Sequence, residues 1–191
     1  MIRKSILAFI ALSFFSVCFA GSIQDAHKAV IARKNTAACS IPVTANISFE
    51  TNNESNALVQ STAEGQTFSS GAGGTLAKIC VNIDDTGTDG TISLRLDDDD
   101  DMTSEYTEDL GTSATISSDG WVCFESVTNP VIPATTTYYI GIMMNEAADL
   151  KWFQDSAAGY ADSSAWSSGT AWNMGTVNVA KDDNFRVYYC E

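Results

Sequence analysis

Residues 74–96 read GTLAKICVNIDDTGTDGTISLRL, and this stretch decides the fold. Apolar residues alternate with other residues from Ile79 to Ile83 and again from Ile92 to Leu96. A period of two is typical of strands with one buried face. The intervening DDTGTDG contains Gly87 and Gly90 and several Asp and Thr side chains, all of which favour turns. We therefore predict a β-hairpin whose apolar face must be covered by a second layer.

Short segments of the same kind follow one another along the chain, separated by turns rich in Gly, Asp, Ser and Pro. About eight such strands predict an all-β fold, an antiparallel β-sandwich of the jelly-roll type. One stretch departs from the pattern. Residues 156–172, SAAGYADSSAWSSGTAW, are small, polar and aromatic, and we predict a long loop there.

The N-terminus has the features of a secretory signal peptide. Arg3 and Lys4 precede an apolar run too short to span a bilayer, and Ala20 is a suitable cleavage site. An alternative is a lipoprotein acylated at Cys18, although the preceding residue is bulky for that processing. We expect a signal peptide over 1–20, an N-terminal helix or arm over 21–38, and the sandwich domain over 39–191. The protein is then secreted, either extracellular or periplasmic.

The charge of the chain limits its partners. Of 10 basic residues, Arg3 and Lys4 leave with the signal peptide, so 8 remain against 24 acidic ones, a net charge near −16. So acidic a surface repels nucleic acid and anionic lipid. We expect no nucleic-acid partner and no membrane insertion. Solubility alone explains this charge, and binding of a divalent cation is the alternative.

Four cysteines, an even number, remain after cleavage, which predicts two disulfides in an exported protein. Cys80 and Cys123 both lie on the face of their strands opposite the apolar residues, so a bridge between them is possible. Cys39 and Cys190 would then join the two ends of the domain. Pairing of Cys80 with Cys190 is nearly as plausible.

Aromatic residues are concentrated in one segment near the C-terminal end. Extracellular sugar recognition commonly uses aromatic rings that lie against pyranose faces. The candidate ligand-binding residues are Trp152, Tyr160, Trp166 and Trp172. The alternative is that the tryptophans are core residues under a long loop.

An acidic run, residues 97–101, follows the second strand of the predicted hairpin. Asp97, Asp99 and Asp101 would share one side of a continuing strand, close enough to bind a hard cation such as calcium. The alternative is a solvated loop. The earlier DDTGTDG stretch lacks the ligand pattern of a calcium loop and is interpreted as a turn.

Catalysis has little support in the sequence. The chain has one histidine, His27, and it has no GxSxG and no HExxH motif. Paired carboxylates for glycoside hydrolysis remain compatible with the composition. Nevertheless the positions predicted to face inward are Ile, Val and Leu, and the acidic residues lie in turns. We therefore expect a protein that is not an enzyme.

Five segments together resemble a known family. They are GQTFSS (65–70), residues 74–96, GWVCFES (120–126), ATTTYYIGI (134–142) and NFRVYY (184–189). Their order and spacing are similar to those of the bacterial extracellular β-sandwich domain of choice-of-anchor secreted proteins, which looks like a carbohydrate-binding jelly roll. The resemblance covers residues 65–190. Cys80 and Cys123 stand where the family has Ser- or Thr-like outward residues, which supports a disulfide between them.

These observations lead to one preferred function and two alternatives. The preferred function is a secreted, non-catalytic module that binds glycan through residues 152–172, with calcium as a possible structural ion. The first alternative is a structural or adhesive surface component that self-assembles or binds an extracellular surface protein, docking through residues 21–38. The second is a secreted hydrolase.

Overall fold

The computed structural model describes residues 39–51, 54–99, 102, 108–156, 165–167, 172, 176–178 and 181–191. The chain divides into two units, residues 1–39 and 40–191. The predicted signal peptide and N-terminal arm lie outside the described residues. Within the described ranges every regular element is a strand, and none is a helix that could cross a membrane.

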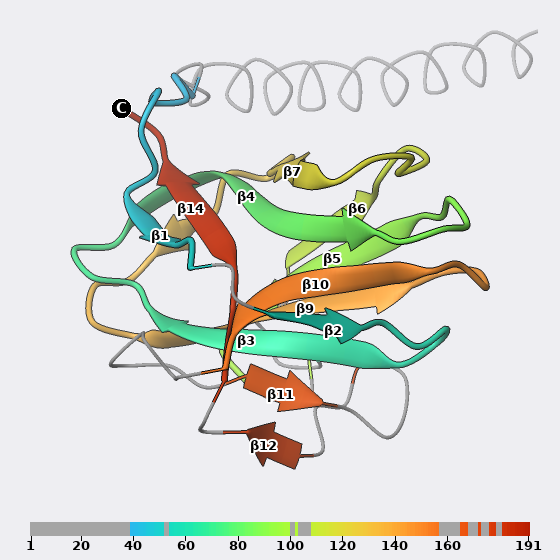
Figure 1. Ribbon diagram of the computed structural model, residues 1–191. Coiled ribbons are helices and arrows are strands. Elements are labelled where there is room, and N and C mark those ends of the chain that lie inside the picture. Colours follow the sequence, from blue (N-terminus) through green and yellow to red (C-terminus); the bar gives the residue numbers. More distant parts are fainter. Residues whose placement is uncertain are drawn as a thin grey trace, which may run out of the picture. The chain divides into compact units, whose positions relative to one another are not determined.

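The strands form two antiparallel sheets that pack as a sandwich, which confirms the predicted fold class (Figure 1). Among the described residues, one sheet has eight strands: β1 (Ile47–Phe49), β2 (Glu54–Ala57), β4 (Gly74–Asp85), β7 (Gly120–Glu125), β8 (Val131–Ile132), β10 (Leu150–Asp155), β13 (Asp182–Asp183) and β14 (Phe185–Tyr189). The other sheet has six: β3 (Ala63–Ser69), β5 (Ile92–Asp97), β6 (Glu108–Thr112), β9 (Thr137–Met144), β11 (Ala165–Ser167) and β12 (Thr176–Asn178). As in a jelly roll, β3, β4 and β5 alternate between the sheets, and so do β9, β10 and β11.

The predicted hairpin is wrong in its pairing, although both of its strands are present. β4 pairs with β7, β8, β10 and β14, whereas β5 pairs with β6 and β9 in the opposite sheet. The residues that connect β4 to β5 form hydrogen bonds with other loops. Thr86 N–H donates to Asp149 O at 3.0 Å, and Gly90 N–H donates to Ile116 O at 3.3 Å. The two apolar faces therefore meet across the core and do not lie side by side.

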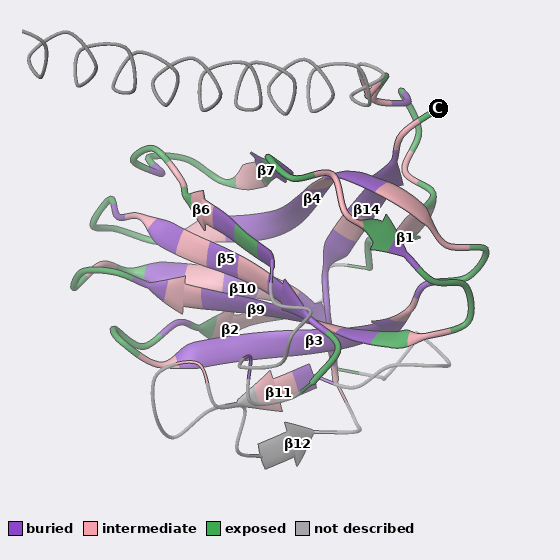
Figure 2. Cartoon of the chain, turned by 180° about the vertical axis from the view of Figure 1, so that it is seen from behind, coloured by how far each residue is buried: buried purple, intermediate pink, exposed green. Residues whose placement is uncertain are grey.

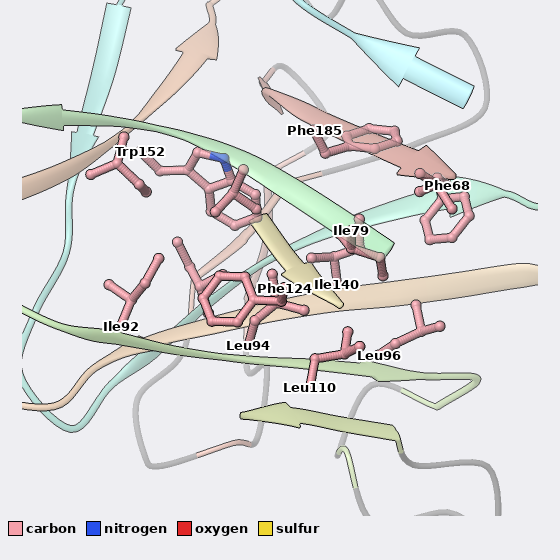
Figure 3. Close-up of a cluster of buried hydrophobic side chains, with 14 of the residues drawn as sticks. Phe68, Ile79, Ile92, Leu94, Leu96, Leu110, Phe124, Ile140, Trp152 and Phe185 are labelled. Atoms are coloured by element: carbon pink, nitrogen blue, oxygen red, sulfur yellow. The ribbon is translucent and has the colours of Figure 1, made fainter. Parts of the chain in front are cut away.

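The core lies between the two sheets (Figure 2, purple). Ile79, Val81 and Ile83 of β4 are fully buried, and so is Leu94 of β5, as the alternation predicts. Figure 3 shows side chains from both layers meeting in this space. Burying one such side chain contributes about 1.5 to 3 kcal/mol.

The C-terminal strand β14 lies between β1 and β4 and completes its sheet. Phe185, Val187 and Tyr189 are buried, as their alternation with polar residues predicts. The ring of Phe185 lies 5.6 Å from that of Phe68 on the opposite sheet. Strand β14 thus contributes a ring contact between the two sheets.

Candidate functional site: the outer face of the six-stranded sheet

The six-stranded sheet has one face toward the core and one face away from it. Tyr138, Ile140 and Ile142 of β9 are buried in the core, so the residues between them in sequence, Tyr139 and Gly141, belong to the outer face. Residues directly opposite each other on neighbouring strands share a face. The register therefore identifies the other residues of this outer face.

One row of the register crosses five strands. Trp166 on β11 lies opposite Gly65 on β3, Gly65 opposite Gly141 on β9, Gly141 opposite Arg95 on β5, and Arg95 opposite Asp109 on β6. The two glycines have no side chains and are themselves buried. Since strands are about 4.8 Å apart, the backbones of Trp166 and Arg95 are about 14 Å apart, and the two glycines between them carry no side chain.

Trp166 is partly exposed and lies on one side of the glycine pair. Its ring meets the ring of Tyr139 edge-on, with centroids 5.7 Å apart and an angle of 67° between the planes. Its indole N–H is buried and has no hydrogen-bond partner among the residues that the structure describes. The sequence predicts a loop at Trp166, but this residue belongs to β11, which pairs with β3. Strand pairing therefore fixes its backbone to the sheet.

Trp172, also partly exposed, contacts Arg95 on the same outer face. The guanidinium of Arg95 lies 4.3 Å from the centre of the Trp172 ring, a cation–π contact. Arg95 Nη2 is also 3.7 Å from Asp109 Oδ2. The Nε of Arg95 is buried and has no hydrogen-bond partner among the described residues. The structure thus brings Trp166 and Trp172 to the same outer face, Trp166 on β11 and Trp172 against Arg95 of β5.

Trp152 is buried in the core, whereas the prediction requires an accessible ligand-binding ring. Its side chain is 0% exposed, and its indole N–H donates to Asn184 O at 2.8 Å. A ring with no accessible face cannot lie against a sugar. The alternative weighed for it, a core residue, is confirmed. The fourth candidate, Tyr160, lies outside the described residues.

The acidic run does not continue β5 as predicted, because the strand ends at Asp97. The chain turns there, and Asp99 N–H donates to Asp97 Oδ1 at 3.0 Å. Asp97 is buried and Asp99 is exposed, whereas Asp101 lies outside the described residues. In the described ranges no three Asp, Glu, His or Cys side chains are grouped so as to hold a metal ion. Calcium binding by this run stays a prediction.

The structure contains the disulfide between Cys80 and Cys123. These residues lie directly opposite each other on β4 and β7, with Cα atoms 4.0 Å apart. Cys39 and Cys190 are disulfide-bonded as well, so every cysteine of residues 39–191 is oxidised. Such use of cysteine is typical of an oxidising compartment outside the cytosol.

Several residues of this face were not predicted as site residues. Arg95 and Tyr139 alternate with core residues, so an outward orientation was readable from the strand pattern. The sequence pattern does not give the register between strands. The register of β3 and β9 shows that Gly65 and Gly141 are neighbours. The expectation that inward positions are apolar also fails on β3, where Glu64 lies opposite Ile142, a core residue.

Together, the fold and this face define a β-sandwich with an aromatic and cationic cluster on the outer face of one sheet. No family model matches the chain, and no curated protein matches it.

Proposed function

We propose that the protein is a secreted, non-catalytic carbohydrate-binding module whose ligand lies on the outer face of the six-stranded sheet. The observation that carries this proposal is the position of Trp166 and Trp172 on one outer face, Trp166 on β11 against Tyr139 and Trp172 against Arg95 of β5. Partly exposed rings that are held in place by such contacts can bind the apolar faces of sugar rings at a small entropic cost.

Two hydrogen-bond donors of this face are shielded from solvent. Trp166 Nε1 and Arg95 Nε are both buried, with no acceptor among the described residues. A buried donor without an acceptor is costly, typically about 1 to 3 kcal/mol. A hydroxyl oxygen of a bound sugar could accept from them only after the groups that cover them move. An acidic polysaccharide is disfavoured, because the 24 acidic residues against 8 basic ones that remain after cleavage would repel it.

The experiment compares single alanine variants at three tryptophans. Trp166→Ala and Trp172→Ala remove rings from the candidate face, whereas Trp121→Ala removes a ring from β7 in the other sheet and is the matched control. The readouts are retention on insoluble cellulose, chitin and xylan, and the change of tryptophan fluorescence on titration with soluble neutral polysaccharides.

We expect the first two variants to bind at least about tenfold more weakly than wild type. The Trp121→Ala control should bind as wild type does. Equal binding by all three variants would show that the ligand lies elsewhere. Absence of binding by the wild-type protein to every glycan of an array would overturn the carbohydrate proposal itself.

A further inference from the structure

One end of the sandwich interior is polar, although the rest of the core is apolar. Glu64 and Gln66 on β3 lie opposite the core residues Ile142 and Ile140, so both point between the sheets. From the other sheet, Asp183 on β13 lies opposite Gln154, which alternates with the core residue Trp152 and therefore shares its face. Glu64 is 5% exposed and Asp183 is 1% exposed.

Hydrogen bonds join the two sheets at this polar end. Gln66 Oε1 accepts a hydrogen bond from Asp183 N–H at 2.6 Å, and Gln66 Nε2 donates to Asp182 Oδ1 at 3.3 Å. Asn56 on β2 donates to Glu64 Oε2 at 3.3 Å. These neutral amides satisfy single atoms and supply no positive charge.

The groups around Glu64 and Asp183 would not neutralise the negative charges of their carboxylates. Among the described residues Asp183 Oδ1 is buried without a hydrogen-bond partner. The nearby cation, Lys181, forms an ion pair with Glu54 on β2 at 3.5 Å. Asp155 on β10 and Asp182 on β13 are acidic as well. Lys151 on β10 precedes the core residue Trp152 and therefore belongs to the outer face of its sheet.

The pKa values of both carboxyl groups are raised in this environment. Burial raises the pKa of Glu64 to about 7, and the hydrogen bond from Asn56 lowers it only in part. Burial also raises the pKa of Asp183 well above its ordinary value. The negative charges of Glu64 and Asp182 add to that rise in pKa, and Lys181 opposes it.

We infer that Glu64 and Asp183 form a proton-holding pair at the junction of β3 and β13, so that the fold is favoured by mild acid and weakened above neutral pH. Two ionised carboxylates buried in this interior, with Lys181 already paired with Glu54, would be strongly unfavourable. When the two carboxyl groups keep their protons, this cost does not arise. When they ionise, the folded state becomes less stable at the contacts that join the two sheets.

The sign of the pH dependence follows from the proton balance. A glutamic acid in the unfolded chain loses its proton near its ordinary pKa of 4.5, whereas folded Glu64, with its pKa raised to about 7, keeps its proton up to neutral pH. Between these values the folded state binds more protons than the unfolded state, so stability falls as pH rises. One such proton raises the unfolding equilibrium constant by about tenfold per pH unit, and the dependence ends above the folded pKa.

The test is urea unfolding of the full chain from pH 5 to pH 8, for wild type, Glu64→Gln and Asp183→Asn. Both substitutions keep the shape of the side chain and remove its charge. Glu108→Gln is the control, since Glu108 is also buried but accepts hydrogen bonds from Ser126 Oγ at 2.9 Å and Thr128 Oγ1 at 2.7 Å. Asp183→Asn serves as the informative variant if Glu64→Gln does not fold.

We expect the unfolding constant of wild type, relative to that of Glu64→Gln, to rise about a hundredfold between pH 5 and pH 8. Glu108→Gln should keep the wild-type slope. Parallel profiles for wild type and both pair variants would overturn the inference. So would a calcium-dependent gain in stability at pH 8 that Glu64→Gln abolishes, because the pair would then hold a cation and not a proton.

Discussion

Arg186 and Glu50 form a two-point ion pair on the eight-stranded sheet. Arg186 Nε donates to Glu50 Oε1 at 2.8 Å, and Arg186 Nη2 donates to Oε2 at 2.7 Å. The same guanidinium lies 3.9 Å from the centre of the Trp121 ring. A planar guanidinium can make both contacts at once, because it donates in its plane and stacks through its face.

Glu50→Gln should lower the free energy of unfolding by up to about 1 kcal/mol at pH 7, a small effect because both side chains are partly exposed. The hydrogen bond from Arg186 lowers the pKa of Glu50. The contribution of the ion pair to stability is therefore fully present above the ordinary pKa of a glutamic acid. It is lost as pH falls through the lowered pKa of Glu50 in the folded protein. Urea unfolding at pH 7 and pH 3 checks this, with Arg186→Lys as a variant that keeps the charge and loses the two-point geometry. An equal difference at both pH values would contradict it.

Trp152→Ala should destabilise the protein by about 3 to 5 kcal/mol, since it leaves a large cavity in the core. Trp152→Phe keeps most of the ring but removes the N–H that donates to Asn184 O. It should cost less than the alanine variant. Chemical denaturation gives both values. If Trp152→Ala were as stable as wild type, the burial of this ring in the folded protein would be in doubt.

Two neighbouring glycines allow a matched comparison in the turn between β3 and β4. Gly71 and Gly73 both have positive φ, 60° and 68°. A Cβ on Gly73 would lie 2.4 Å from Ile132 O, whereas a Cβ on Gly71 would meet nothing within 4 Å. Both alanine variants should lose about 1 kcal/mol from the backbone conformation. Gly73→Ala should lose clearly more in thermal unfolding, and equal losses would contradict the close contact.

Removing the Cys80–Cys123 bridge by the double substitution to alanine should lower stability by about 2 to 4 kcal/mol. The bridge closes a loop with a sequence separation of 43 residues, which limits the freedom of the unfolded chain. Urea unfolding of the double variant under non-reducing conditions measures the effect. Reduction of the wild-type protein should destabilise it further, because Cys39 and Cys190 are also disulfide-bonded.

If calcium is a structural ion of the acidic run, a chelator should lower the melting temperature of the wild-type protein. Asp97→Asn and Asp99→Asn should reduce that shift, since each removes a charged ligand. Differential scanning calorimetry with and without calcium decides the question. An unchanged melting temperature would show that calcium is not a structural ion of this protein.

Local pattern identified many elements of the fold but missed β11, where it predicts a loop. Alternation with a period of two identified the buried faces of β4, β5 and β14, because a residue's side of a strand follows from its position alone. The same rule placed Cys80 and Cys123 on the strand faces opposite the core, where Cys123 is exposed and Cys80 is buried. It failed at Glu64, where an acidic residue occupies an inward position on β3.

The sequence by itself determined that the chain is a β-sandwich and which strand positions belong to its apolar core. Only the tertiary structure decided that β4 and β5 lie in opposite sheets, and that Trp166 and Trp172 share a face while Trp152 is buried. The physical reason is that one strand's alternation fixes which side is apolar, whereas its neighbour is chosen by hydrogen bonds with segments distant in sequence. A strand does not encode its partner locally.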